Sequence, residues 1–179
     1  MTKRSICVFC GASDGIDPVY GAAATELGAL IAAKDMRLVY GAGDVGLMGR
    51  VARAAQTGGA DTFGVIPQHL VNWEVGKTDL TSYIVTENMH ERKKVMFMNS
   101  DAIAVLPGGA GSLDEFFEVL TWAQLELHSK PIVLVNINGY WDPLLALLDH
   151  VIAQGFAKES VKSFFKVADT PEAALTLLK

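Results

Sequence analysis

A glycine-rich stretch at Leu106–Glu115, reading Leu-Pro-Gly-Gly-Ala-Gly-Ser-Leu-Asp-Glu, constrains this chain more than any other segment. The apolar run Ala102–Leu106 leads into it and indicates a buried strand. A helical pattern follows, with apolar residues at Phe116, Leu120, Ala123 and Leu127. Pro107 ends the strand, and the glycines let the backbone turn tightly and expose its amide groups. A strand, a glycine loop and a helix N-terminus together form a cradle for a phosphate or a carboxylate.

The polar residues at the end of this stretch also have a purely structural interpretation. Ser112 followed by Glu115 matches a capping box, which needs no ligand. Asp114 and Glu115, expected in the first helical turn, also stabilise the helix dipole by about 0.3–1 kcal/mol each. A helix cap does not require three glycines, however. We therefore interpret the stretch as an anion site to which Ser112 adds a hydroxyl donor.

Length and composition favour one globular domain over residues 1–179, because half of the residues are hydrophobic and they are spread along the chain. The net charge of −5 argues against a general nucleic-acid binder. The apolar runs are too short to span a membrane, and the one near the N-terminus is too short for a signal peptide. We expect a cytoplasmic protein without nucleic-acid or membrane partners.

Neither the cysteines nor the histidines indicate a metal or redox site. Cys7 and Cys10 form a C-x-x-C, but they lie along an expected strand, where positions three apart point to opposite faces. We interpret them as core residues. The four histidines are widely separated and lack metal-ligand spacing.

Apolar runs and helical patterns alternate along the chain, which predicts an α/β fold with a mostly parallel sheet and helices on both faces. Strands are expected at Ser5–Cys10, Arg37–Tyr40, Thr62–Ile66, Ser82–Thr86, Ala102–Leu106, Pro131–Val135 and Phe164–Val167. Long helices are expected after Asp17, from Leu47, from Asn88, from Leu113, from Trp141 and after Thr170.

Glycine-bearing loops follow three of these strands, at Gly11–Gly15, Gly41–Gly49 and Pro107–Gly111. In parallel sheets ligands bind outside the carboxyl ends of the strands, so the three loops predict one site for a phosphorylated molecule. The second loop matches G-x-G-x-x-G formally, but Asp61 lies before the next strand, not at its end, where a dinucleotide's ribose would need it. We expect a phosphate cradle there and not a bound dinucleotide.

Two further segments of the sequence are compatible with more than one interpretation. Met89, Arg92, Lys93 and Met96 share one helix face, where a basic side chain either snorkels over the core or extends into a pocket; spacing alone favours snorkelling. Residues Pro67–Asp79, which include Trp73 and Glu74, are irregular and polar. They fit a lid, a partner contact or a long connection.

These motifs resemble the LONELY GUY family of cytokinin riboside 5′-monophosphate phosphoribohydrolases. The family pattern P-G-G-x-G-T-x-x-E stands here as Pro107–Glu115, with Ser112 replacing Thr, and M-H-x-R-K stands as Met89–Lys93. The segment V-Y-G-G-G-x-x-G-L-M-G stands as Val39–Gly49, with Ala42 replacing a glycine. If the backbone needs positive φ there, Ala42 is strained.

The resemblance implies a Rossmann-like domain that hydrolyses the N-glycosidic bond of a nucleoside 5′-monophosphate, without metal or organic cofactor. It implies that Arg92 and Glu115 are the catalytic pair, with Met89 and Lys93 on the base side. It also implies that the 5′-phosphate and ribose are held by Ser13, Gly43, Gly46, Pro107, Gly108, Gly109, Gly111 and Ser112.

The family's short members are homodimers, which implies a homodimer here. Phe116, Phe117 and Trp122 are candidates for the contact, although they also suit the core of one protomer. Two other functions remain open: a general purine nucleotide nucleosidase acting on AMP, and a nucleotide-binding module without catalysis. Similar proteins have been labelled lysine decarboxylases, but no lysine here has a convincing pyridoxal-phosphate setting.

Overall fold

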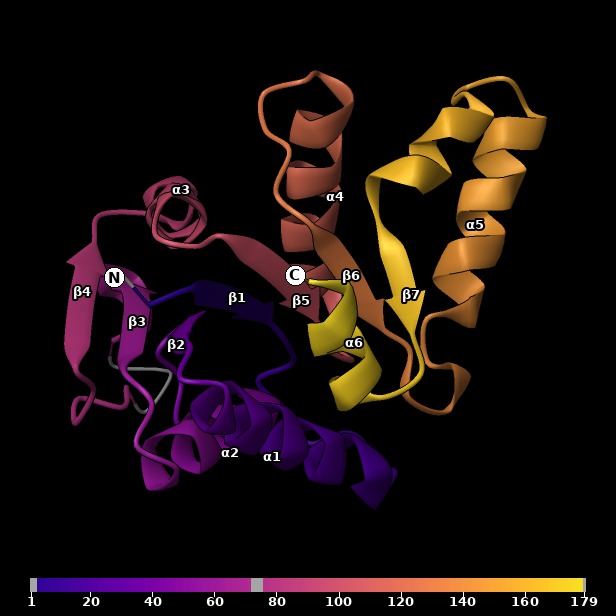
Figure 1. Cartoon of the computed structure of the whole chain (residues 1–179). Helices are drawn as coiled ribbons and strands as arrows, with labels where there is room; N and C mark the ends of the chain where they lie inside the picture. The colour runs from indigo at the N-terminus through magenta and orange to yellow at the C-terminus, as the bar shows by residue number, and fades with distance from the viewer. Residues whose placement is uncertain (1–2, 72–75, 179) are drawn as a thin grey trace.

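Seven parallel strands form one sheet in the order β4-β3-β2-β1-β5-β6-β7. The computed structural model describes residues 3–71 and 76–178 (Figure 1). The strands are β1 Ser5–Phe9, β2 Arg37–Tyr40, β3 Thr62–Pro67, β4 Ser82–Thr86, β5 Ala102–Val105, β6 Ile132–Val135 and β7 Lys166–Ala168. All seven expected strands are confirmed, with β7 shifted by two residues at its start because residues 159–164 form a 3₁₀ helix.

Six α-helices among the described residues cover both faces of this sheet. They are α1 Pro18–Ala33, α2 Gly46–Thr57, α3 Met89–Met98, α4 Ala110–Gln124, α5 Asp142–Ala153 and α6 Pro171–Leu177. Short 3₁₀ helices lie at Gln68–Leu70, Ile137–Gly139 and Glu159–Phe164. Helices α1, α2 and α6 pack on one face and α3, α4 and α5 on the other (Figure 1). The expected Rossmann-like α/β fold is confirmed, and no helix among the described residues is long and apolar enough to cross a membrane.

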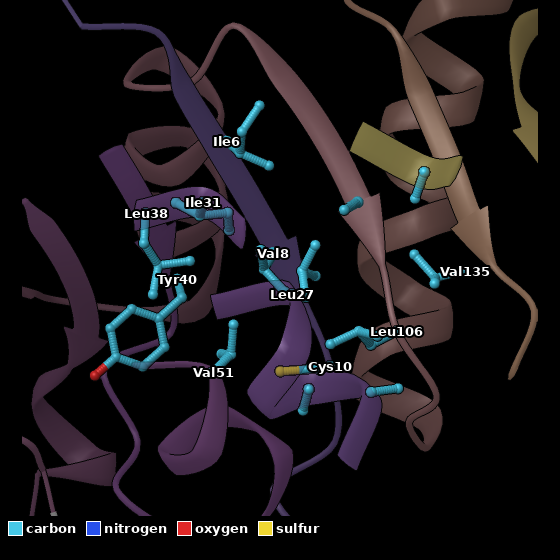
Figure 2. Packing of buried hydrophobic residues seen from close by; sticks show 14 of the residues in the cluster. Ile6, Val8, Cys10, Leu27, Ile31, Leu38, Tyr40, Val51, Leu106 and Val135 are labelled. Atoms are coloured by element: carbon cyan, nitrogen blue, oxygen red, sulfur yellow. The ribbon is translucent and has the colours of Figure 1, made fainter. Parts of the chain in front are cut away.

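Successive side chains of β1 point to opposite faces of the sheet, because a strand is pleated, and they therefore enter both hydrophobic cores. Cys7 lies in the core beneath α3, α4 and α5, whereas Cys10 lies in the core beneath α1 and α2. Both thiols are buried and unpaired with each other, which confirms the prediction of core cysteines. Figure 2 shows the second of these cores, where β1 side chains meet Leu27 and Ile31 of α1 and Val51 of α2.

Several helix starts follow their sequence signals. The side chains of Asp17, Asn88 and Thr170 cap α1, α3 and α6 by accepting backbone N–H bonds. Helix α4 differs from the prediction, because its N-cap is Gly109 and the helix already begins at Ala110. The interpretation of Ser112 and Glu115 as a capping box is therefore wrong.

The earlier start of α4 changes the position of its acidic residues. Ser112 lies inside the first turn, whereas Asp114 and Glu115 lie beyond it, and the first turn carries no acidic residue. The two carboxylates are therefore not explained as first-turn dipole partners, and another reason is needed for them.

The order of the strands reverses at β1. From β1 the chain builds outward through β2, β3 and β4, then crosses to the other side of β1 to form β5 (Figure 1). The loops that follow β1 and β5 consequently lead to opposite faces, to α1 and α4. Such a reversal leaves a crevice at the carboxyl ends of the two strands, where open α/β sheets bind ligands.

Ala42 has a left-handed backbone conformation, with φ of 59°, and it is fully buried. The expected strain is therefore present where the family pattern has a glycine. A left-handed conformation costs an L-residue about 1–2 kcal/mol. The buried methyl group offsets part of this cost by packing, since burial of one such group contributes about 0.8 kcal/mol.

The close packing of α1 on α2 yields a stability prediction. A Cβ at Gly28 would collide with the backbone oxygen of Val51, whereas a Cβ at Gly21 would meet only the flexible Arg50 side chain. Gly28→Ala should lower the free energy of unfolding by about 1–3 kcal/mol because the helices must separate. Gly21→Ala, in the same helix, should be neutral or stabilising by about 0.5–1 kcal/mol. Urea denaturation of both variants tests this, and equal effects would contradict it.

Candidate functional site

A cavity of about 710 Å³ lies at the reversal point of the sheet. Its walls come from the loops after β1, β2 and β5, from one side of α3, and from the first turns of α4. A volume of this size is typical of sites for small organic ligands. The cavity therefore lies where the three glycine-bearing loops were expected to meet.

The three loops contact one another directly, which fixes the floor of the cavity. The Gly11 N–H donates to Pro107 O at 3.0 Å, and the Met48 N–H donates to Gly11 O at 3.3 Å. Gly46 has φ of 58°, and a Cβ there would collide with Ala12. Glycine at position 46 is thus required by the packing of two loops against each other.

Two other glycines have no such packing reason. A Cβ at Gly109 or at Gly111 would meet no atom within 4 Å, and both residues line the cavity. The first intrahelical donor is the Leu113 N–H, so the N–H groups of Ala110, Gly111 and Ser112 precede the hydrogen-bonded part of α4. A helix N-terminus with open space in front of it is suited to bind an anion.

Arg92 is held in the cavity wall by two backbone carbonyl groups. It belongs to α3 and is only 5% exposed. Its Nε donates to Val65 O at 3.1 Å, and its Nη2 donates to Gly41 O at 2.8 Å. Glycine suits position 41, because a Cβ there would collide with the guanidinium. The snorkelling interpretation is wrong for Arg92. Its guanidinium is buried and donates to carbonyl oxygens of β3 and of the loop after β2, and it does not extend into solvent.

Glu115 faces the same cavity from α4 and is 9% exposed. The Cys10 thiol, also in the cavity wall, lies within the electric field of both charged groups. Burial raises the pKa of Cys10 far above its usual range; the Glu115 carboxylate raises this pKa further, and the Arg92 guanidinium opposes the rise. A carboxylate and a guanidinium thus converge over the carboxyl end of β1.

The structure also adds two tyrosines that the sequence reasoning missed. The Tyr140 hydroxyl donates to Gly108 O at 2.7 Å, and its ring packs edge-to-face on Tyr20 with centroids 5.4 Å apart. Both residues line the cavity. Tyr20 follows the first glycine-bearing loop and was detectable by that neighbourhood. Tyr140 follows β6, and no glycine-rich motif marked its loop.

Most of the expected site residues line this cavity, namely Ser13, Met89, Arg92, Pro107, Gly108, Gly109, Gly111, Ser112 and Glu115. Three others are placed differently. Gly43 forms a backbone bridge with Gly76, and Gly46 packs on the first loop. Lys93 is outside the lining, because its ammonium binds Asp114 and Glu118 on α4.

The segment after β3 was expected to be a lid, a partner contact or a long connection, and the structure describes part of it. Residues 68–70 form a 3₁₀ helix, and Trp73 and Glu74 lie outside the described residues. Within residues 3–71 and 76–178, no three His, Cys, Asp or Glu side chains gather as metal ligands would.

Comparison with known proteins places this site in a family. A family model described as "Possible lysine decarboxylase" matches residues 48–178. The chain is 42% identical to the probable cytokinin riboside 5′-monophosphate phosphoribohydrolase LOGL2 of Oryza sativa subsp. japonica, over 98% of this chain and 72% of that protein. It is 39% identical to the phosphoribohydrolase LOG3 of Arabidopsis thaliana, over 98% of this chain and 82% of that protein. The chain belongs to the LOG family.

Solved structures agree with the fold of this LOG-family protein. The molybdenum cofactor binding protein from Rippkaea orientalis superposes with a TM-score of 0.75 at 25% identity, covering 99% of this chain and 96% of that one. The Moco carrier protein of Chlamydomonas rheinhardtii gives a TM-score of 0.70 at 21% identity, covering 98% of this chain and 95% of that one. The latter likeness shows the shared fold alone.

The thiols of this LOG-family protein should be chemically inert in the folded state. Burial raises the pKa values of Cys7 and Cys10, and the Glu115 carboxylate raises both further, so the thiolate fraction at pH 8 is very small. We expect no reaction with a thiol-specific disulfide reagent under native conditions and two equivalents of reaction after denaturation. Fast native labelling of either cysteine would contradict this.

Proposed function

We propose that this protein hydrolyses the N-glycosidic bond of adenosine 5′-monophosphates, including N6-prenylated ones, to release the free base and ribose 5-phosphate. One observation carries the proposal: Arg92 and Glu115 line the same cavity as an open anion cradle at the start of α4. The membership of the LOG family supports the same reaction, since its named members are phosphoribohydrolases.

The cradle holds the 5′-phosphate in this proposal. The N–H groups of Ala110, Gly111 and Ser112 donate to the phosphate oxygens, and the Ser112 hydroxyl adds a further donor. Tyr140 supports the cradle by donating a hydrogen bond from its hydroxyl to Gly108 O. The phosphate does not react, so its binding energy serves to position the ribose.

Glu115 and Arg92 act at the glycosidic bond. The Glu115 carboxylate stabilises the oxocarbenium-like state and takes a proton from the attacking water. The water oxygen bonds to C1′ while the bond from C1′ to the base nitrogen breaks and leaves its electron pair on the base. The proton taken up by Glu115 is released to solvent, and the leaving nitrogen takes up a proton from solvent, so that Glu115 is again a carboxylate and one water is consumed in total. Arg92 orients the substrate and stabilises developing negative charge, because a guanidinium does not readily give up a proton.

We further propose that the protein is a cytoplasmic homodimer with no nucleic-acid partner. The net charge of −5 supports a small-molecule substrate.

Phe116 is fully buried in the core of one protomer and is therefore removed from the candidate dimer contact. Phe117 and Trp122 are partly buried, and Leu125 and Leu127 are exposed by 63% and 68% beside them on the chain. A monomeric mass by light scattering would refute the dimer.

Product analysis with AMP and with isopentenyladenosine 5′-monophosphate tests the proposed reaction. Release of free base and ribose 5-phosphate from either nucleotide supports it, and the ratio of the two kcat/KM values ranks the substrates. Preference for AMP would favour a general purine nucleotide nucleosidase. Binding of both nucleotides without release of base would favour a binding module, because related folds also serve cofactor carriers.

Glu115→Gln should lower kcat for base release by at least about 1,000-fold, because the amide is a poor base and carries no charge. The matched control is Glu126→Gln, at an exposed position in the turn after α4, which should leave kcat unchanged. Base release is measured by chromatography, and the melting temperature of each variant is measured alongside. Near-normal turnover of Glu115→Gln would overturn the assigned role.

Gly111→Val should raise KM for AMP at least about tenfold, because its side chain occupies the cradle that the phosphate needs. Stability should rise or stay the same, since the space is open and a glycine is removed from a helix. Activity and stability are thus expected to move in opposite directions, which separates loss of the cradle from misfolding. An unchanged KM would place the phosphate elsewhere.

A further inference from the structure

Helices α3 and α4 carry one catalytic residue each and stand on different parts of the sheet. Helix α3 packs against β3 and β4, whereas α4 packs against β1 (Figure 1). Arg92 lies on the first helix and Glu115 on the second. The separation of these two charged groups therefore depends on how the helices are joined to each other.

An ion-pair cluster joins the two helices through residues that are next to Arg92 and Glu115 in the chain. The Lys93 ammonium lies 2.8 Å from a carboxylate oxygen of Asp114 and 3.2 Å from one of Glu118. Lys93 follows Arg92 in the chain, and Asp114 precedes Glu115. The cluster thus ties together the residues adjacent to both catalytic groups.

This cluster is more protected than an ordinary surface ion pair. The Lys93 side chain is 7% exposed and that of Glu118 is 23% exposed, whereas Asp114 is 59% exposed. Burial alone lowers the pKa of Lys93, but the hydrogen bonds to Asp114 and Glu118 outweigh it and raise that pKa above its usual value. The lysine is therefore charged at neutral pH.

The helices also have an apolar contact, which lies one turn further along α3 than Lys93. The Phe97 ring packs edge-to-face on Trp122, with centroids 5.0 Å apart. The Lys93 cluster joins the helices one turn nearer the start of α3 than Phe97, at the residue next to Arg92.

We propose that Lys93 is a positioning residue: by binding Asp114 and Glu118, it sets the distance between Arg92 on α3 and Glu115 on α4. This inference rests on the proposed function for its kinetic consequence. It differs from a base-side contact, because the Lys93 ammonium is held by carboxylates of α4 and lies outside the cavity lining. A displacement of about 1 Å between reacting groups is enough to cost about 100-fold in rate.

Lys93→Met removes the ammonium and keeps an unbranched side chain. We expect kcat for AMP to fall at least tenfold with KM changed less than threefold, and Lys93→Arg to restore most of the activity. A rise in KM with normal kcat would mean that Lys93 contacts the substrate and would overturn the proposal. The matched control is Lys162→Met, because Lys162 also binds two carboxylates, Asp149 and Glu159, far from the cavity. Its kcat and KM should be normal.

A double-mutant comparison tests whether Lys93 acts through its partners. Asp114→Asn combined with Glu118→Gln should reproduce the loss of kcat, and adding Lys93→Met should cause no further loss. Multiplying losses, or normal kcat in the carboxylate variant, would overturn the proposal. If Lys93→Met folds poorly, the carboxylate variant is compared with and without Lys93→Arg instead. The substitution at Lys93 should again cause no further loss of kcat.

A crystal structure of Lys93→Met, or of the carboxylate variant, gives a readout that does not need turnover. We expect the first turns of α4 to shift relative to α3, while the contact of Phe97 with Trp122 is kept. An unshifted α4 would overturn the positioning role. If the wild-type protein released no base from any nucleotide, the proposed function would fail, yet this structural comparison would still decide the role of Lys93.

Discussion

The reversal of strand order at β1 is the constraint on which the rest of this structure depends. Because β2 and β5 flank β1 and their crossovers lie on opposite faces, the chain cannot cover the carboxyl ends of β1 and β5. The cavity is the space that this topology leaves open. The loops after β1, β2 and β5 are brought together there, and the bond from Gly11 to Pro107 holds two of them in register.

Two groups of opposite charge, Arg92 and Glu115, line that crevice and are both largely buried. The guanidinium of Arg92 is anchored by carbonyl oxygens of Gly41 and Val65, at the ends and edges of strands that cannot move independently. The carboxylate of Glu115 comes from a helix on another part of the same face. Charges that are largely buried interact more strongly than charges in water, so the proposed reaction depends on how the two helices hold these groups relative to each other.

Local signals were sufficient for the elements of the fold. The apolar runs predicted every strand, and Asp17, Asn88 and Thr170 are helix caps of the expected chemistry. Local signals gave a wrong prediction where one sequence pattern is compatible with two different structures. Ser112 and Glu115 have capping-box spacing, yet the open glycine loop lets α4 begin at Ala110. Arg92 has snorkelling spacing, yet buried carbonyl groups of distant strands satisfy its guanidinium better than solvent does.

The sequence by itself determined the α/β class, the glycine-bearing loops at one edge of the sheet and the family motifs at Met89–Lys93 and Pro107–Glu115. It did so because periodicity, caps and turns depend on neighbours in the chain. Only the tertiary structure decided which motif residues line the cavity: it brought Tyr140 beside Gly108, and it paired Lys93 with α4 and Gly43 with Gly76. Those placements depend on contacts between residues far apart in the chain, and no local pattern encodes the geometry of such contacts.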